Sequence, residues 1–274
     1  MPIDLPDDLT SVLREGRQAY IAVPSKDGPH VTPELYTWSD GRLWFASATT
    51  TLKAKVLDRE RRGGALVTSA GRSVVLTGPV EAYDPRDVKG IASSLRSLPS
   101  LARASGSFVT RNASDLLAFV GDTARGRLGR KPPPLRVLFA LDPDHAAGVE
   151  NERLTGSWGG WRSPAVTADA AVPAGGAAAV LALPGPVPVP ARWFDDEAEV
   201  FVAPDLLDML ELEDRVPIGL VTDEYHRPGP AAKVGTLLRG EARRSDRTGI
   251  LEVDAERIIE WDGVATSSRP ADEV

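Results

Sequence analysis

The sequence contains two stretches whose pieces match in the same order, and this repetition constrains the fold more than any other feature. Residues 32–46 (TPELYTWSDGRLWFA) match residues 189–203 (VPARWFDDEAEVFVA) in length, in one Pro position and in their apolar ending. The later pieces GALVTS, SVVLTGPVEA and FALDPDHAAG match IGLVTD, GTLLRGEARR and LEVDAERIIEWDG, with Gly78 opposite Gly240. A preserved order indicates a diverged internal duplication. The alternative is that two unrelated β-rich stretches look alike.

The first copy is predicted to consist of short strands interrupted by helices. A helix is expected over 7–16, because Pro and acidic residues open it and Gly16 ends it. Asp40-Gly41 between two apolar runs predicts a tight hairpin. Helices are also expected over 50–61 and from Pro85 to about Gly126, the latter broken near Pro99 and Gly106. Strands are expected at RQAYIAV, HVTPELYTW, RLWFAS, GALVTS, SVVLTGPVEAY and LRVLFALDP. This alternation favours a small barrel over a doubly wound parallel sheet.

A change of composition marks a boundary between the two copies. Residues 165–190 are rich in Ala, Gly and Pro, with prolines alternating near the end of the segment. Because proline cannot donate a ladder hydrogen bond, the segment predicts a linker or an edge strand. We expect two domains, an N-terminal barrel over residues 1–150 that carries the site and a diverged second barrel over residues 151–274. The predicted fold class is mainly β with helices (α+β), arranged as two tandem barrels.

Composition and charge exclude several classes of protein. The 274 residues contain no cysteine, which excludes disulfides, thiolate metal sites and cysteine nucleophiles. The net charge of −7 argues against a general nucleic-acid binder, because such binding depends on neutralising phosphates. No apolar run approaches the roughly 20 residues that a membrane span needs, and the acidic start lacks the apolar region of a signal peptide. We expect a soluble, cytoplasmic protein with no membrane or nucleic-acid partner.

The sequence lacks the common signatures of catalysis. It has no GxSxG, GxxxxGK[ST] or GxGxxG motif. Its three histidines, His30, His145 and His226, are far apart, so neither a metal site nor a catalytic triad is predicted. His145 or His226 as a haem ligand is an open alternative. No catalytic residue can be assigned.

One segment predicts a phosphate site. The run FASATTTLKAKVL ends a strand, passes through Thr50 and Thr51 and opens a helix with Lys53 in its first turn. The N-terminus of a helix attracts anions through its unpaired amides and its dipole, and the hydroxyls and the lysine would complete the site. The alternative is an ordinary Thr-capped helix with a solvent-facing lysine. A second basic segment, residues 125–136, has four Arg and one Lys and no acidic residue.

The order of these pieces resembles the pyridoxamine 5′-phosphate oxidase-like split β-barrel superfamily, which includes flavin and deazaflavin oxidoreductases. The resemblance covers residues 17–84 well and the strand LRVLFALDP loosely, and the second half matches only as a diverged tandem copy. It implies an FMN-binding-like fold with the cofactor in a cleft between two barrels. Its site pattern implies that Thr51 and Lys53 hold the phosphate, while the flavin ring and ribityl chain are lined by Thr32, Pro33, Ala46 and Ser47.

The departures from the family pattern restrict the function. Leu52 stands in place of a second cation, and residues 61–63 replace an Asn-Pro, so pyridoxal phosphate synthesis is doubtful. The second copy has PDLLDMLEL where the first has SATTTLKAK, and its acids would repel a phosphate. We therefore expect one cofactor per chain, with the second barrel acting as an internal pseudo-dimer partner.

The resemblance implies a flavin-dependent oxidoreductase that moves hydride to or from a small organic substrate, with FMN as the first choice of cofactor. A deazaflavin-dependent reductase is an alternative, because the basic segment over residues 125–136 would suit the anionic tail of that coenzyme. A non-catalytic flavin- or haem-binding module is a second alternative. Candidate ring-stacking residues are Trp158, Trp161 and Trp193, although core packing is the simpler role for each.

Overall fold

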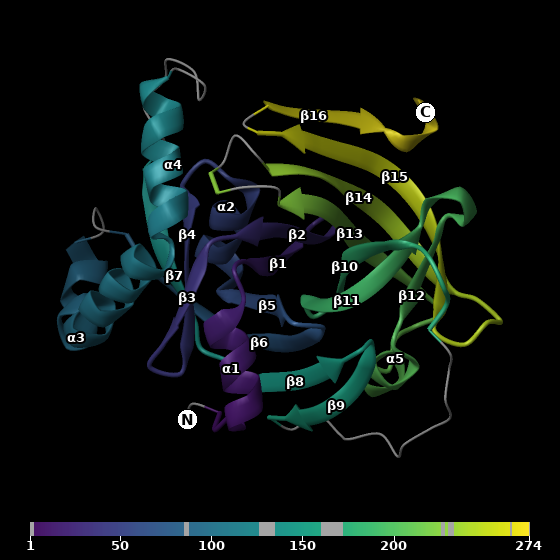
Figure 1. Ribbon diagram of the computed structural model, residues 1–274, viewed down its shortest axis with the longest axis horizontal. Helices are drawn as coiled ribbons and strands as arrows, with labels where there is room; N and C mark the ends of the chain where they lie inside the picture. Colours follow the sequence, from purple (N-terminus) through teal and green to yellow (C-terminus); the bar gives the residue numbers. More distant parts are fainter. Residues whose placement is uncertain are drawn as a thin grey trace.

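Two antiparallel β-sheets make up most of the molecule (Figure 1). The computed structural model describes residues 3–84, 88–125, 135–159, 172–225, 228–229, 233–263 and 265–273. In this part of the chain the first sheet has nine strands and the second has seven. The first consists of β1 (Ala19–Ser25), β2 (Gly28–Glu34), β3 (Tyr36–Ser39), β4 (Arg42–Ala48), β5 (Arg62–Ser69), β6 (Arg72–Tyr83), β7 (Arg136–Leu141), β8 (His145–Glu150) and β9 (Arg153–Trp158). The second consists of β10 (Ala177–Leu183), β11 (Val187–Phe194), β12 (Glu199–Val202), β13 (Arg215–Tyr225), β14 (Lys233–Arg244), β15 (Ile250–Asp262) and β16 (Ala265–Pro270).

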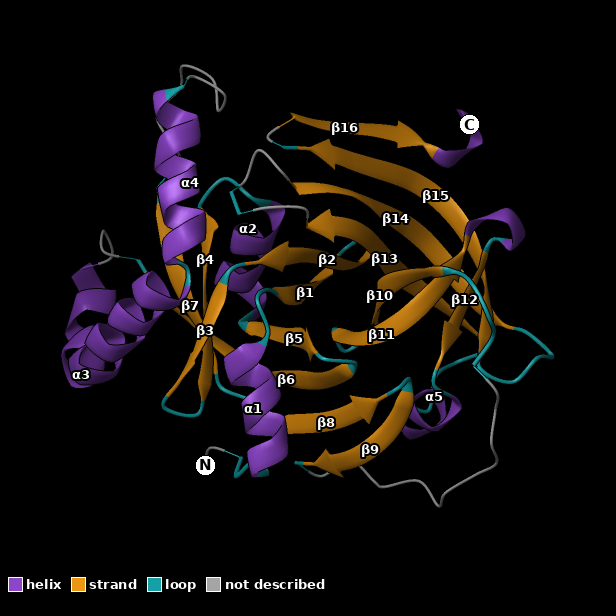
Figure 2. Ribbon diagram, in the orientation of Figure 1, coloured by secondary structure: helices purple, strands orange, loops and turns teal. Residues whose placement is uncertain are grey.

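Most of the helices gather around the first sheet (Figure 2). They are α1 (Asp7–Glu15), α2 (Leu52–Glu60), α3 (Val88–Arg111) and α4 (Ala113–Ala124), whereas the short α5 (Pro204–Met209) belongs to the second half. Short 3₁₀ turns occupy Asp195–Glu197 and Ala271–Glu273. Among the described residues, no helix is long and apolar enough to cross a membrane.

The two sheets repeat one order of strand pairing. In the first, the neighbours run β2-β1-β5-β6-β7-β4-β3, which leaves an open half-barrel. In the second they run β12-β11-β10-β13-β14-β15, and pairing of β12 with β15 closes a barrel of six strands. Element by element, β10 and β11 take the places of β1 and β2, while β13 and β14 take those of β5 and β6. The predicted fold class, mainly β with helices in two tandem split barrels, is confirmed.

Gly78 and Gly240 show the repetition at atomic detail. Gly78 lies on β6 and Gly240 on β14, two strands with equivalent places, and at each a β-carbon would collide with a backbone carbonyl oxygen. The oxygen belongs to Asp142 for Gly78 and to Asp254 for Gly240. There β6 changes partner, from β8 up to Thr77 to β7 from Val80, and β14 and β15 have a bulge between Arg239 and Gly240. Only glycine allows such a close backbone approach, so the matched glycines have one physical cause.

The two barrels pack through the first hairpin of each. The carbonyl oxygen of Pro186, in the turn between β10 and β11, lies against Gly64 on β5. In the reciprocal contact, the carbonyl oxygen of Pro29 on β2 lies against Gly219 on β13. The apolar cluster inside the second barrel also continues into the first through residues such as Ala22, Leu66, Val75 and Val149. The interface between the barrels is therefore built like a protein core.

The long helix departs from the prediction. Breaks were expected near Pro99 and Gly106, but α3 runs through both residues and ends at Arg111. The helix packs against β3, and this tertiary contact offsets the hydrogen bond that Pro99 cannot donate. The interruption comes at Asn112, whose backbone leaves the helical region before α4 begins.

The boundary segment is partly described. Residues 187–190 of β11 pair only with β10, whereas residues 191–194 also pair with β12. The proline-rich portion is thus an edge, as one of the two alternatives predicts, and residues 160–171 lie outside the described residues. The first sheet continues past residue 150, because β9 pairs with β8. The division into domains at residues 150 and 151 stays a prediction.

Candidate functional site

The strand-to-helix turn after β4 forms as the sequence predicts. The chain leaves β4 at Ala48, and Thr51 caps α2 with an extended backbone. The Thr51 hydroxyl donates to the Ala48 carbonyl at 2.8 Å and accepts from the Ala54 amide at 3.2 Å. This cap satisfies one amide of the first turn and orients the helix N-terminus toward the end of β4.

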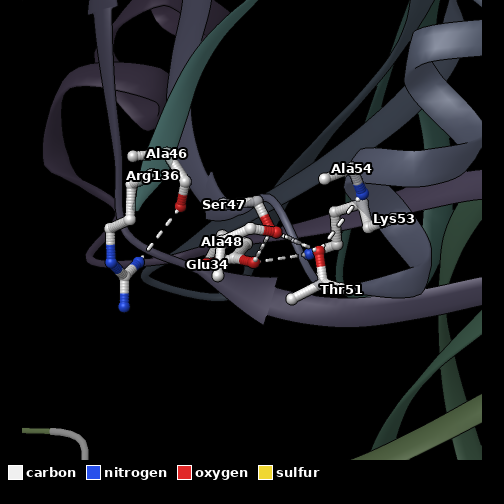
Figure 3. Close-up of polar contacts among 8 residues, drawn as sticks. All are labelled: Glu34, Ala46, Ser47, Ala48, Thr51, Lys53, Ala54 and Arg136. Atoms are coloured by element: carbon white, nitrogen blue, oxygen red, sulfur yellow. Dashed lines mark hydrogen bonds and ion pairs between the residues drawn. The ribbon is translucent and has the colours of Figure 1, made fainter. Parts of the chain in front are cut away.

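Lys53 points into the protein rather than toward solvent. Its side chain is only 2% exposed, and its Nζ donates to Oε1 of Glu34 at 2.8 Å. Ser47 Oγ donates to the same oxygen at 3.4 Å and lies 3.0 Å from Thr51 Oγ1 (Figure 3). The expected free lysine facing a phosphate is therefore an ion-paired lysine, held by a carboxylate from the neighbouring strand.

Electrostatics around this ion pair are strongly positive. Burial lowers the pKa of the Lys53 ammonium, and Glu34 opposes that shift through its charge and its hydrogen bond. Lys233 and Arg136 lower the pKa further, because they are nearby cations. Three cations thus gather near one paired carboxylate.

A cleft of about 250 Å³ lies beside the ion pair, and both sheets contribute to it. Arg136 comes from the start of β7, and its Nη1 donates to the Ala46 carbonyl at 3.3 Å. Lys233 comes from the start of β14 in the second sheet, and aromatic walls come from α3 and α4. The cleft is lined by, among others, Glu34, Ala46, Phe108, Asp115, Phe119, Arg136 and Lys233. Cations beside flat apolar walls can hold the anionic group and the ring of one ligand.

The predicted site residues fall into three groups. Ala46 lines the cleft, and Ser47, Thr51 and Lys53 gather around Glu34. Thr50 is exposed at the turn before α2. Thr32 and Pro33 lie on β2 opposite Ile21 and Tyr20, outside the described lining of the cleft.

The two described tryptophans among the candidates, Trp158 and Trp193, are not in the described lining of the cleft. Trp193 is buried in the core of the second barrel, and Trp158 packs against the core of the first. Trp161 lies outside the described residues, as do Arg127, Arg130 and Lys131 of the basic segment. The aromatic walls are instead Phe108 and Phe119.

Sequence reasoning missed four residues of this region: Glu34, Phe108, Phe119 and Lys233. The two phenylalanines lie in helical sequence with no local signal of a ligand. Lys233 belongs to the other half of the chain and reaches the cleft only because the barrels pack together. Glu34 ends β2, two strands before the turn that begins α2, so no local pattern in the sequence indicates it as the partner of Lys53.

The surroundings of the two described histidines, His30 and His145, indicate structural roles. His30 lies on β2 with its Nδ1 buried and without a hydrogen-bond partner among the described residues. Burial lowers its pKa to about 3, with Lys53 and Arg239 adding to the shift. His145 Nδ1 lies 2.8 Å from Asp144, which also binds Arg62, and His226 lies outside the described residues. The described residues contain no group of three or more His, Asp or Glu side chains that could hold a metal ion.

No protein-family model matches the sequence, and no curated protein matches it significantly. Solved structures do match. About half of the chain matches pyridoxamine 5′-phosphate oxidase-like split β-barrel proteins.

Three of these structures illustrate the likeness. A conserved hypothetical protein from Mycobacterium tuberculosis is 18% identical, with a TM-score of 0.38 over 55% of this chain and 88% of that one. A Clostridium acetobutylicum protein related to general stress protein 26, of the pyridoxinephosphate oxidase family, is 12% identical, with a TM-score of 0.36 over 55% and 91%. An FAD-binding protein from Mesorhizobium loti is 20% identical, with a TM-score of 0.35 over 54% and 97%. At these identities the likeness concerns the fold alone.

Proposed function

We propose that the cleft beside α2 binds a flavin, FMN in the first place, and that the protein is an oxidoreductase acting on a small organic molecule. The observation that carries this proposal is the meeting of Arg136 and Lys233, from two different barrels, at one cleft beside the ion pair of Lys53 with Glu34. A phosphate is favoured there by charge-assisted hydrogen bonds. Phe108 and Phe119 supply flat apolar surface for a ring.

The residues present fit such a cofactor with one change from the family pattern. Because Glu34 already neutralises Lys53, the phosphate would lie beside Arg136 and Lys233. Lys53 would support this site indirectly, through its ion pair with Glu34. The described cleft of about 250 Å³ is smaller than the roughly 300–1,000 Å³ usual for a ligand pocket. A flavin bound there would therefore extend beyond the described walls.

The cofactor would supply the hydride chemistry, and the chain would supply binding and orientation. Arg136 and Lys233 would fix the anionic end, and the phenylalanines would exclude water from one face of the ring. This division of labour agrees with a sequence that lacks an acid–base constellation.

Binding of FMN and riboflavin tests the proposal directly, because they differ only in the phosphate. We expect FMN to bind more tightly, and Arg136→Gln to weaken FMN about ten- to a hundredfold, the effect of losing roughly 1.5–3 kcal/mol of charge-assisted hydrogen bonding. Riboflavin affinity should stay unchanged in the variant. Lys55→Ala, at an exposed lysine on α2, is the matched control. Equal affinities for FMN and riboflavin would refute a phosphate site at this cleft.

Spectra and turnover separate the remaining alternatives. The absorption spectrum of the purified protein distinguishes flavin, deazaflavin and haem. A deazaflavin is the alternative cofactor, because the basic segment from Arg125 to Arg136 would suit its anionic tail. Steady-state reduction of a dye by a nicotinamide donor would support an enzyme, and a bound cofactor without turnover would support a non-catalytic module.

A further inference from the structure

A second and larger cavity lies between the two sheets. It encloses about 560 Å³. The side chains that decide its chemistry are Tyr20, Leu66, Val149, Glu152, Arg192 and Asp223. Sequence reasoning assigned no function to any of them.

The strand ladders show that this cavity is the counterpart of the first cleft. Gly71 precedes Gly78 by as many residues as Lys233 precedes Gly240, and each lines its own cavity. On the other barrel, Ala191 of β11 takes the place of Glu34 of β2, and Arg192 takes that of Leu35, the residue after β2. The second cavity therefore has a glycine where the first has a cationic Lys233.

The described lining of the second cavity carries a net negative charge, Glu152 and Asp223 against Arg192, whereas the lining of the first cleft balances Arg136 and Lys233 against Glu34 and Asp115. Among its described lining residues the only cation is Arg192, whose Nε donates to Glu152 Oε1 at 2.5 Å. Asp223 adds a second carboxylate that no described cation of the lining pairs with. An anionic ligand would meet these carboxylates without a cation left to receive it.

The hydrogen-bonding groups of the second cavity also argue against an anionic ligand. Oε2 of the lining residue Glu152 is buried without a hydrogen-bond partner among the described residues. Asp223 accepts from the Tyr20 hydroxyl at 2.6 Å and from Gln18 Nε2 at 3.0 Å, and a carboxylate can accept further bonds. Burial and the charge of Asp223 raise the pKa of Tyr20, so its hydroxyl remains a donor to Asp223. Because the cavity has hydrogen-bond acceptors in excess, it favours a ligand with several hydrogen-bond donors.

We propose that this cavity binds a small organic amine in its protonated form. The ammonium group would donate to Glu152 and Asp223, and its apolar body would lie against Leu66, Val149 and Val221. The volume falls within the range usual for pockets that enclose small ligands. This inference does not rest on the proposed flavin function, because a separate cavity with other side chains carries it.

Three probes of one shape and different charge test the proposal: tryptamine, tryptophol and indole-3-acetate. Ligand-observed NMR and calorimetry on the full chain should show tryptamine binding at least tenfold more tightly than indole-3-acetate, with tryptophol between them. Indole-3-acetate binding as tightly as tryptamine would overturn the proposal, and so would the absence of binding by all three probes.

Two nearly isosteric variants locate the binding. Asp223→Asn should weaken tryptamine about tenfold, whereas Glu224→Gln, the next residue on the strand and on its opposite face, should leave it unchanged. Glu152→Gln should release Arg192 and shift the preference toward indole-3-acetate. The far-UV circular dichroism spectrum and the melting temperature, measured in the same variants, should stay close to the wild-type values and report that they are folded. Unchanged tryptamine affinity in both Asp223→Asn and Glu152→Gln would place the amine elsewhere and refute this site.

Discussion

The ion pair of Lys53 with Glu34 shows what spacing in a sequence can and cannot predict. Thr51 was correctly expected to begin a helix, because capping is a local interaction between residues a few positions apart. The direction of the Lys53 side chain depends on β2, which is 19 residues away in sequence. No local pattern contains that contact, so the lysine was expected to be free.

Removing either member of this pair should destabilise the fold. Lys53→Met leaves Glu34 without its cation, and Glu34→Gln leaves a buried ammonium without its anion. Each should lower the free energy of unfolding by at least about 1–3 kcal/mol, the cost of an unpartnered buried polar group. The double variant should lose less than the sum of the two, because it removes both charges. Urea denaturation measures all three, and Lys55→Met is the exposed control, expected within about 0.5 kcal/mol of wild type. Small and additive effects would show that the pair is not coupled.

His30 should make the protein sensitive to acid. Its pKa is about 3 in the folded protein and ordinarily 6.5, so the unfolded chain binds a proton in the interval where the folded chain does not. The stabilisation is complete above pH 6.5 and is lost as the pH falls toward 3, at up to about 1.4 kcal/mol per pH unit. Urea denaturation between pH 7 and 4 should therefore give a shallower pH dependence for His30→Phe than for wild type. Parallel curves would mean that His30 is protonated in the folded state.

At the scale of elements, local signals predicted most of the first barrel. The Asp40-Gly41 turn has both residues at positive φ, as a tight hairpin requires, and α1 and α2 begin and end close to their predicted limits. The predicted breaks in α3 were wrong because Pro99 and Gly106 weaken a helix only by amounts that packing can offset. The matching of Gly78 with Gly240 succeeded because a backbone collision leaves no other choice of residue.

Glycine substitutions distinguish positions where a backbone collision requires glycine from a position where glycine only weakens a helix. Gly78→Ala and Gly240→Ala should each destabilise the protein strongly, because the added methyl group collides with backbone that cannot move aside as a flexible side chain would. Gly106→Ala is the matched control: no atom lies within 4 Å of the added carbon, so about 1 kcal/mol of helix stabilisation is expected. Thermal denaturation distinguishes the two classes. Equal melting temperatures for Gly106→Ala and Gly240→Ala would contradict the close approach at the bulge.

At the scale of the whole molecule, the two barrels form one interface and two unlike cavities. Their shared apolar cluster and reciprocal hairpin contacts bind the halves to each other. The sequence predicted the repetition and one basic site, but not the second cavity. That cavity arises from residues of both halves, among them Tyr20 and Asp223, which are 203 positions apart.

Titration should give one FMN per chain. The first cleft has two cations, Arg136 and Lys233, in its described lining, whereas the second has a glycine in place of Lys233 and only Arg192 against its two carboxylates. Fluorescence titration with FMN, combined with a protein concentration determined from amino-acid analysis, measures the ratio. Two equivalent sites would contradict the assignment of the anion-binding site to the first cleft alone.

Joining the two barrels in one chain has a genetic consequence. In an assembly of two identical subunits, every codon change is expressed at both symmetry-related cavities, so one cavity cannot gain a property without the other. Here the codons for Glu34 and Ala191, or for Lys233 and Gly71, mutate separately although they occupy equivalent places. Each cavity can therefore come under its own selection, and a mutation that improves one leaves the inherited chemistry of the other intact.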